Sequence, residues 1–336
     1  VTTQDSTLSG GDQSVVGSQA GRDINTGDTI TVYAREGSKV VIGGEDAPVK
    51  MTAVARESTL GKYLQHLISR NRYLQLQGIR SGGRLVHIEL DQIYITLRAP
   101  RQRRLEEEQA FLAAEAQLAP GERHRLAGQQ TTTETVSVSV NEALADFKRL
   151  VVLGDPGSGK TTLLRYLALC YARDVAEKSD LVSSNLGLTE SGHRPILLYL
   201  RQIGRFLSAH RPQDDGTEGH TLLLDFLHQS LKNENFKLER DFFEAWLTTG
   251  RAVILLDGLD EVADPDLRRR VSRLVEAFCR AYPHCRYVIT SRIVGYSGAA
   301  RLGENFSTTT VRDFNLKEIK RFLTNWHRLL AVGQMG

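Results

Sequence analysis

Hydrophobic residues follow two different spacings in the second half of the chain, from about residue 131 onward. Short continuous apolar runs, typical of strands buried on both faces, lie at Leu150–Leu153, Ile196–Leu200, Ala252–Leu256, Tyr287–Thr290 and Thr308–Val311. Between and after them, apolar residues recur at helical spacing over Lys160–Arg173, Thr221–Leu231, Asp266–Ala281 and Leu316–Leu329. This alternation predicts an α/β fold in which a parallel sheet is flanked by helices.

The first 47 residues have a different pattern, in which Gly, Thr and Ser separate very short apolar pieces. Val15-Val16, Ile30–Tyr33 and Val40–Ile42 lie between or after turn residues such as Gly27-Asp28. Such a pattern predicts short strands joined by tight turns. A small array of β-hairpins and one coil of a β-solenoid both fit it, and a flexible polar tail is an equally good interpretation of the same composition.

Residues 48–100 combine the two spacings. Leucine and isoleucine recur at helical spacing from Leu60 to Ile68, and strand-like runs follow at Leu85–Ile88 and Ile93–Leu97. We therefore expect a small α+β segment here.

Residues 101–130 are highly charged. Arg103 precedes Glu107 by four positions, and Arg104 precedes Glu108 by the same spacing. Opposite charges at this spacing stabilise a helix, so we expect a solvated helix or helical linker.

Composition and charge narrow the class of protein. The 336-residue chain is 40% hydrophobic and 25% charged, which excludes a fully disordered chain or a collagen. Its apolar runs are far shorter than the ~20 residues of a membrane-spanning helix. The net charge of +3 gives no direct evidence for a nucleic-acid partner. Three cysteines without a Cys-x-x-Cys pair favour a reducing, cytoplasmic location.

The strongest chemical motif follows the strand predicted at Leu150–Leu153. The sequence GDPGSGKT at Gly154–Thr161 matches G-x-x-x-x-G-K-[ST] and leads into an apolar helix, the setting that a phosphate-binding loop requires. Glycines let backbone N–H groups curl around a phosphate, and the helix N-terminus favours its negative charge. We expect a nucleotide to be bound by Gly154, Asp155, Pro156, Gly157, Ser158, Gly159, Lys160, Thr161 and Thr162. Lys160 would reach the β- and γ-phosphates, Thr161 would hold Mg²⁺ and Thr162 would contact the α-phosphate.

A second motif lies about 100 residues downstream. The buried run Val253–Leu256 ends in Asp257, and two further acidic residues, Asp260 and Glu261, follow closely. A carboxylate at the end of such a strand can hold Mg²⁺ beside the phosphate loop. Either of the two later carboxylates could orient and deprotonate an attacking water. We favour Glu261 because its side chain is longer, and Asp260 remains the alternative.

A third motif is the strand that ends in Thr290-Ser291-Arg292. In a nucleotide-binding fold such a strand lies beside the phosphate-loop strand. Arg292 could then detect or stabilise a γ-phosphate through charge-assisted hydrogen bonds.

Together, these three motifs resemble the NACHT domain, the NTPase module of the STAND class of signal-transducing ATPases. The resemblance covers about residues 131–330, and its most specific part is VILLDGLDEV at Val253–Val262, where Gly258 directly follows the Mg²⁺ aspartate. It implies that ATP, ADP and Mg²⁺ are the ligands, that Thr161 and Asp257 hold the metal, and that hydrolysis is slow. It also implies a switch that homo-oligomerises when a trigger and ATP open it; many bacterial, NLR-like members act in defence against phage.

These interpretations divide the chain into five segments: a Gly/Thr-rich β-strand tail at 1–47, a small α+β segment at 48–100, a charged helical linker at 101–130, a NACHT P-loop NTPase core at 131–311, and the start of a helical subdomain at 312–336. The family's winged-helix domain and C-terminal repeats are not recognisable in the sequence, so we expect a C-terminally truncated fragment. The trigger is unidentified, with a phage-derived molecule as one candidate.

Three alternatives stay open at this point. The chain could be a constitutive P-loop ATPase, or a STAND-type transcription or signalling regulator without a role in defence. It could also be a binding protein in which the first 130 residues act and the nucleotide is only structural.

Overall fold

The computed structural model describes most of the second half of the chain and shorter parts of the first, namely residues 30–33, 39–42, 53–74, 80–81, 84–85, 88–104, 133–209, 219–234, 236, 240–303 and 305–333. The chain divides into two compact units, Val1–Tyr63 and Leu64–Gly336.

The first unit contains a two-stranded hairpin. Strand β1 (Ile30–Tyr33) pairs antiparallel with β2 (Lys39–Ile42), which confirms the two strands expected there. The expected piece at Val15-Val16 lies outside the described residues. Helix α1 (Ala53–Asn71) begins in this unit and includes the predicted helical stretch from Leu60 to Ile68.

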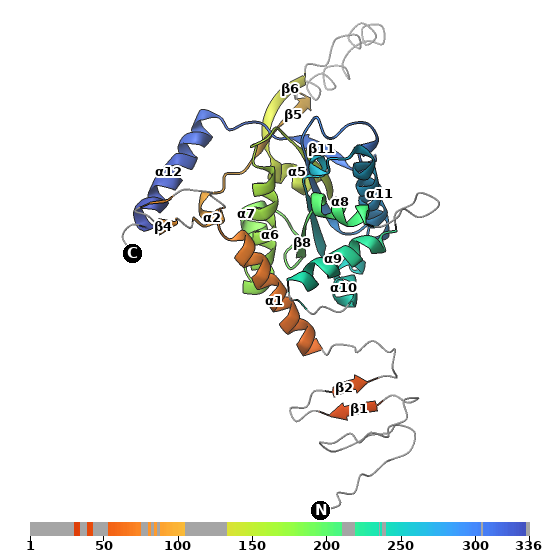
Figure 1. The fold of residues 1–336 in the computed structure, drawn as a ribbon. Coiled ribbons are helices and arrows are strands. Elements are labelled where there is room, and N and C mark those ends of the chain that lie inside the picture. The colour runs from red at the N-terminus through yellow and green to blue at the C-terminus, as the bar shows by residue number, and fades with distance from the viewer. Residues whose placement is uncertain are drawn as a thin grey trace, which may run out of the picture. The chain divides into compact units, whose positions relative to one another are not determined.

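The second unit is built on a five-stranded parallel sheet, with β11 and β8 as its outer strands (Figure 1). The strand order is β11-β7-β10-β9-β8. The strands are β7 (Arg149–Leu153), β8 (Arg194–Tyr199), β9 (Ala252–Asp257), β10 (Arg286–Ser291) and β11 (Ser307–Thr310). Every residue of β9 and β10 is buried, as the continuous apolar runs predict for strands covered on both faces. The predicted α/β fold and all five predicted strands are confirmed, with small differences at their ends.

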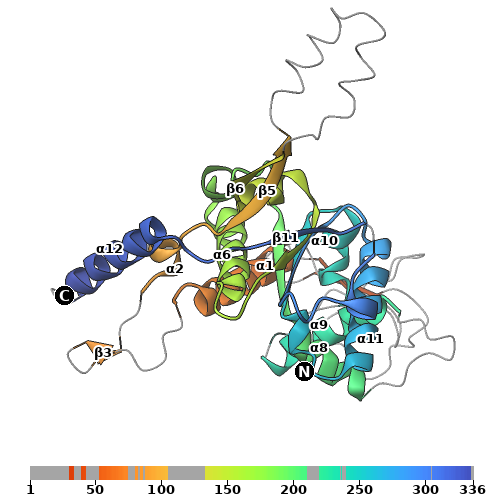
Figure 2. The same ribbon diagram turned by 90° about the horizontal axis from the view of Figure 1, so that it is seen from above.

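Helices flank this sheet on both sides. Helices α6 (Lys160–Glu177) and α7 (Leu181–Leu186) lie on one side, whereas α8 (Leu200–Ser208), α9 (Thr221–Asn233) and α11 (Pro265–Ala281) lie on the other (Figures 1 and 2). Shorter helices are α2 (Leu90–Ile93), α5 (Val140–Asp146) and α10 (Glu244–Thr248), and 3-10 turns are η1 (Arg240–Phe242), η2 (Leu259–Glu261) and η3 (Gly298–Ala300). The four predicted helices are confirmed.

One predicted strand ends earlier in the structure, and another is absent. Leu200 begins α8 rather than ending β8. Ile93 ends α2, and Tyr94–Leu97 has no regular secondary structure, so the strand predicted at Ile93–Leu97 is wrong. In place of strand pairing, this segment makes side-chain contacts: the ring of Tyr94 stacks on that of Tyr166 at a centroid distance of 3.8 Å.

The strand predicted at Leu85–Ile88 is present only in part. Leu85 lies in β4 (Arg84–Leu85), which pairs with β3 (Arg80–Ser81). Ile88 lies outside any strand, and the two residues between them are outside the described part of the chain.

The start of the charged segment was also predicted wrongly. Residues 101–104 belong to strand β5 (Arg98–Arg104), which pairs antiparallel with β6 (Thr133–Ser139). Arg103 and Arg104 are therefore not in a helix, because pairing with the alternating TETVSVS strand outweighs the weak local preference from charge spacing. Residues 105–130, the rest of the expected helical linker, lie outside the described residues.

Helix α12 (Leu316–Gly333) follows the last strand. Asn315 and Glu318 begin it, because the Asn315 side chain accepts a hydrogen bond from the Glu318 N–H and the Glu318 carboxylate accepts one from the Asn315 N–H. Arg312 pairs with Glu318 at 3.0 Å and also donates to the hydroxyl of Ser137 in β6. These contacts connect the first turn of α12 to strand β6.

Candidate functional site

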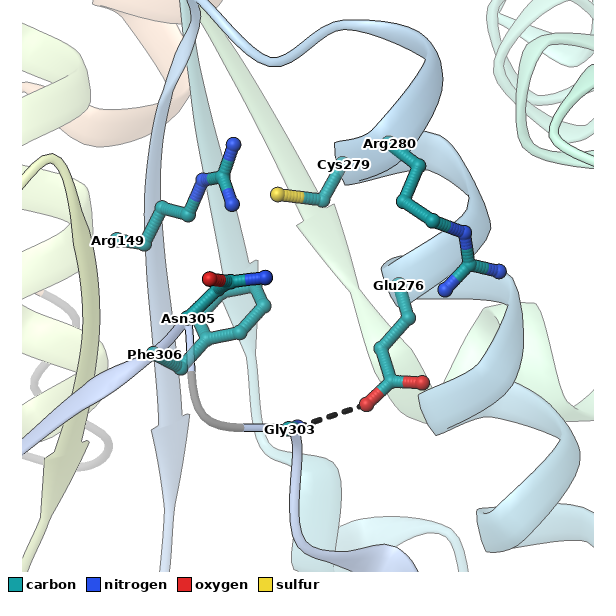
Figure 3. A pocket seen from close by; sticks show the side chains of 7 residues that line it. All are labelled: Arg149, Glu276, Cys279, Arg280, Gly303, Asn305 and Phe306. Atoms are coloured by element: carbon teal, nitrogen blue, oxygen red, sulfur yellow. Dashed lines mark hydrogen bonds between the residues drawn. The ribbon is translucent and has the colours of Figure 1, made fainter.

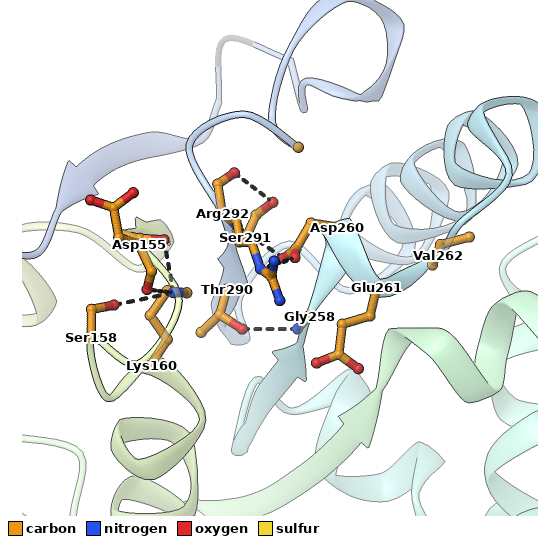
Figure 4. A network of polar contacts seen from close by, with 12 residues as sticks. Asp155, Ser158, Lys160, Gly258, Asp260, Glu261, Val262, Thr290, Ser291 and Arg292 are labelled. Carbon is orange, nitrogen blue, oxygen red and sulfur yellow. Dashed lines mark hydrogen bonds and ion pairs between the residues drawn. The ribbon is translucent and has the colours of Figure 1, made fainter.

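A pocket of about 280 Å³ lies at the carboxyl ends of β7, β9 and β10. Because β10 lies between β7 and β9, three loops that are far apart in the sequence meet there. Figure 4 shows the polar residues of this region. The pocket is lined by Pro156, Gly157, Gly159, Lys160, Thr161, Thr162, Asp257, Gly258, Asp260, Glu261, Thr290 and Arg292.

In the phosphate loop that follows β7, Lys160 is hydrogen-bonded to other residues of the same loop. The Nζ atom of Lys160 donates hydrogen bonds to the carbonyl oxygens of Gly154 and Asp155, both at 2.8 Å, and to Oγ of Ser158 at 3.1 Å (Figure 4). Burial lowers the pKa of Lys160, and the nearby Asp260 carboxylate partly offsets this effect. These backbone partners keep the ammonium group at the centre of the loop, where phosphate oxygens could replace them.

Two glycines of this loop are required by geometry. A Cβ on Gly154 would lie 2.5 Å from Cγ2 of Val311 and 2.6 Å from Oγ of Ser158. Gly159 has a φ of +86°, and a Cβ there would lie 3.3 Å from Leu97. The compact shape of this loop therefore depends on residues without side chains.

Asp257 lies at the end of β9 and is only 5% exposed. Its Oδ1 accepts a hydrogen bond of 2.6 Å from the hydroxyl of Thr290, which itself accepts one of 2.9 Å from the N–H of Gly258. Burial raises the pKa of Asp257, and the hydroxyls of Thr290 and Thr161 partly offset this rise. A carboxylate and a hydroxyl are hard oxygen donors, so Asp257 and Thr161 suit Mg²⁺.

Gly258 makes the turn that follows Asp257. Its φ is +75°, and a Cβ at this position would lie 3.0 Å from the side chain of Glu261. Glu261 is 43% exposed, and its Oε2 lies 3.9 Å from Nε of Arg201 at the start of α8. A glycine after the aspartate therefore leaves room for the Glu261 side chain beside the pocket.

Asp260 is bound to Arg292. Its Oδ1 accepts a hydrogen bond of 2.9 Å from the N–H of Arg292, and its Oδ2 lies 3.0 Å from Nε of the same residue (Figure 4). The Asp260 side chain is 11% exposed, whereas that of Arg292 is 54% exposed. Asp260 thus holds both the backbone and the guanidinium group of Arg292, while about half of the arginine side chain remains exposed to solvent.

The structure brings the three predicted motifs into one pocket. Three of the predicted phosphate-loop residues do not line the pocket but accept hydrogen bonds from the Lys160 ammonium group, namely Gly154, Asp155 and Ser158. The sequence analysis did not single out Thr290 as a site residue, although a hydroxyl residue at the carboxyl end of a strand could have suggested it. It also missed Leu97 and Arg201, whose proximity to the site depends on the fold.

Outside this pocket, we searched the described residues for a metal-binding cluster, a disulfide and a membrane-spanning helix. They contain no cluster of three or more His, Cys, Asp or Glu residues suited to a metal ion. Cys170, Cys279 and Cys285 are free and buried. None of the helices in the described part of the chain combines the length and the apolar character that a bilayer span requires.

A second hollow of about 170 Å³ lies near the amino end of β7 (Figure 3). Two arginines and one glutamate line it together with Cys279, whose pKa is raised by burial. A protonated, buried thiol is a poor nucleophile. The lining residues are Arg149, Glu276, Cys279, Arg280, Gly303, Asn305 and Phe306.

Comparison with protein families identifies the domain that carries the pocket. The family model of the NACHT domain matches residues 148–329, just over half of the chain. This range contains all three motifs of the pocket. A search of curated proteins finds no match.

Proposed function

The chain belongs to the NACHT domain family, whose members are P-loop NTPases of the STAND class, and on this premise we propose that it is an ATP-driven molecular switch with slow hydrolysis. The observation that carries the proposal is the convergence of Lys160, Thr161, Asp257 and Arg292 on a single pocket. The preference for adenine over guanine in this proposal rests on the family, because the sequence contains no Asn/Thr-Lys-x-Asp motif that would read a guanine.

Binding would begin at the loop Gly154–Thr161. The β- and γ-phosphates replace the carbonyl and hydroxyl partners of Lys160, and the N–H groups at the start of α6 bind the same phosphates. Asp257 and Thr161 would hold Mg²⁺, which supplies positive charge against the phosphate oxygens when bound. Thr290 fixes the rotamer of Asp257 through its hydroxyl.

Glu261 is the better general base of the two candidate carboxylates. Both oxygens of Asp260 already have partners on Arg292, so a proton taken from water would remove the negative charge that holds this arginine. Glu261 lines the same pocket, is 43% exposed, and has Arg201 at 3.9 Å as its ion-pair partner in the described part of the chain. We assign Glu261 to the attacking water and Asp260 to holding Arg292.

Arg292 is the proposed sensor of the γ-phosphate. Its guanidinium lines the pocket from the strand next to the phosphate-loop strand. ADP offers no γ-phosphate to this group, whereas ATP offers a charged partner within the same pocket. The balance between the Asp260 partner and the γ-phosphate would then report which nucleotide is bound.

The finer parts of the proposal rest on the family. We propose that ATP exchange, prompted by a trigger, leads to homo-oligomers that activate an effector, and that the chain acts in the cytoplasm of a bacterium in defence against phage. The trigger is a phage-derived molecule in the simplest form of this idea.

The test is nucleotide binding by the Lys160→Ala variant. Calorimetric titration should give binding of ATP and ADP to the unaltered chain and no detectable binding to the variant, because the variant loses both the charge that meets the phosphates and the three hydrogen bonds that hold the loop around it. Lys232→Ala, on the exposed face of α9, is the matched control and should bind as the unaltered chain does. Unchanged ATP affinity in Lys160→Ala would refute the assignment of the pocket.

A turnover assay distinguishes the alternatives. A switch should hydrolyse ATP slowly until it is triggered, whereas fast steady turnover without a trigger would indicate a constitutive ATPase. If Lys160→Ala changes no measurable activity of the protein, the nucleotide is only structural and the N-terminal residues act alone.

A further inference from the structure

Arg268 of α11 joins two loops of the pocket from behind. Its guanidinium donates hydrogen bonds to three backbone carbonyl oxygens: that of Val262 at 2.9 Å, that of Asp260 at 3.4 Å and that of Gly295 at 3.5 Å. The first two belong to the acidic turn, Asp257–Val262. The third belongs to the sensor loop, Arg292–Tyr296, which follows β10.

The same two loops are also in direct contact. A Cβ on Gly295 would lie 2.4 Å from Cβ of Asp260 and 3.2 Å from its Cα. A backbone turn, with the N–H of Gly295 donating to the carbonyl of Arg292 at 3.1 Å, holds the sensor loop in this place. No side chain fits between Gly295 and Asp260, so the spacing of the two loops is fixed closely.

Arg268 itself does not line the pocket. It bonds instead to the backbone of residues in or beside the pocket lining. One acceptor is the carbonyl of Asp260, whose side chain binds Arg292, and another is the carbonyl of Val262, which directly follows Glu261. A guanidinium presents five donors in a rigid plane and can serve three separate acceptors, whereas a lysine ammonium on a flexible stem cannot hold the same fork.

We propose that Arg268 is a positioning residue for nucleotide discrimination and hydrolysis. By tying the acidic turn to the sensor loop, it sets the position of Arg292 relative to a γ-phosphate and the direction of Glu261 toward water. This inference rests on the proposed function, since it requires that Arg292 distinguishes ATP from ADP at this pocket.

The experiment compares Arg268→Ala and Arg268→Lys with Arg269→Ala. Arg269 is the next residue of the same helix, is exposed and pairs with Asp266, so its removal changes the charge equally without touching either loop. We expect Arg268→Ala to lower kcat about tenfold, as loss of a supporting partner commonly does, and to reduce the ratio of ATP to ADP affinity. Affinity for ADP should match that of Arg269→Ala.

Arg268→Lys covers the case in which Arg268→Ala folds poorly. It keeps the charge and the aliphatic stem but loses the fork, so we expect the same direction of change in kcat and in the ATP-to-ADP ratio, with a melting temperature close to that of the control. Values for Arg268→Lys equal to those of Arg269→Ala in both measurements would overturn the proposal.

A double-mutant cycle with Arg292→Ala separates positioning from a general loss of structure. If Arg268 acts through Arg292, removing Arg292 lowers the ATP-to-ADP ratio in the unaltered chain but has little further effect in Arg268→Ala. Additive losses would contradict the inference. If the proposed function itself is wrong, the unaltered chain will not bind nucleotide, or will bind it no better than Lys160→Ala does.

Discussion

At the scale of single residues, Asp260 and Glu261 differ in environment although they are neighbours in the sequence. Asp260 is nearly buried and holds both the backbone and the side chain of Arg292. Glu261 belongs to the same 3-10 turn, lines the pocket and is 43% exposed. The same functional group can therefore serve as an anchor in one position and as a base in the next.

We expect Glu261→Gln to bind ATP as the unaltered chain does and to hydrolyse it about 100-fold more slowly, since a positioned general base contributes at least this much. Binding is measured by calorimetry and hydrolysis by single-turnover phosphate release. Asp260→Asn is the paired variant, and it should change the ATP-to-ADP affinity ratio more than Glu261→Gln does. Unaltered turnover in Glu261→Gln would transfer the role of base to Asp260.

At the scale of elements, strand β10 organises the site because it lies between the phosphate-loop strand and the strand that carries Asp257. Its carboxyl end supplies Thr290, and Arg292 follows one residue beyond the strand. Its amino end is fixed by Arg286, which is 4% exposed and pairs with Glu190 through two contacts of 2.5 and 2.8 Å. Arg286 also donates to the carbonyl of Leu144 at 2.5 Å, so one buried charge joins β10 to α5.

This ion pair predicts a pH-dependent stability. Burial alone would raise the pKa of Glu190, but the hydrogen bonds and charge of Arg286, with the hydroxyl of Tyr171, outweigh burial and lower it. A lowered pKa in the folded state means that the stabilisation is present above the unfolded pKa of about 4.3 and is lost as the pH falls through the folded pKa.

Accordingly, Glu190→Gln should lower the free energy of unfolding at pH 7 by about 3 kcal/mol, the cost of leaving a buried charge without its partner. The difference from the unaltered chain should shrink in acid, as measured by urea unfolding at several pH values. Glu177→Gln, which removes an exposed carboxylate 3.8 Å from Arg173, is the control and should cost less than ~1 kcal/mol. A deficit for Glu190→Gln that is equal at all pH values would contradict the electrostatic account.

At the scale of the whole molecule, the unit Leu64–Gly336 contains the entire pocket. Helix α12 extends from it and carries exposed apolar side chains at Leu316, Ile319 and Leu323. Arg312 anchors the start of this helix to β6 and to Glu318. A nucleotide-dependent change in this unit would therefore have an attached helix through which to act.

A switch of the proposed kind predicts assembly that depends on ATP. With Mg²⁺ and ATP, Glu261→Gln should accumulate as oligomers because it binds ATP without consuming it, whereas Lys160→Ala should keep the mass that it has without nucleotide. Light scattering coupled to size-exclusion chromatography measures both, with ADP as the matched ligand. Identical masses for Glu261→Gln in ATP and ADP would argue against nucleotide-driven assembly.

The sheet, the main helices and the phosphate loop could all be predicted from patterns along the chain. Buried parallel strands and amphipathic helices impose periods on the chain, and GDPGSGKT at Gly154–Thr161 specifies a backbone conformation within eight residues. These are local constraints, so a linear pattern records them. The expectation that β10 lies beside the phosphate-loop strand came instead from the strand arrangement of nucleotide-binding folds, and it is confirmed.

The partners of the side chains could not be predicted in this way and are seen in the folded structure alone. Charge spacing predicted a helix at Arg103 and Arg104, yet a strand from thirty residues further along pairs with them. The bonds from Asp260 to Arg292 and from Arg268 to Gly295 join residues 32 and 27 positions apart. Neither pair forms part of a periodic pattern, because a hydrogen bond between loops depends on the distance and direction of two groups that the folded sheet brings together.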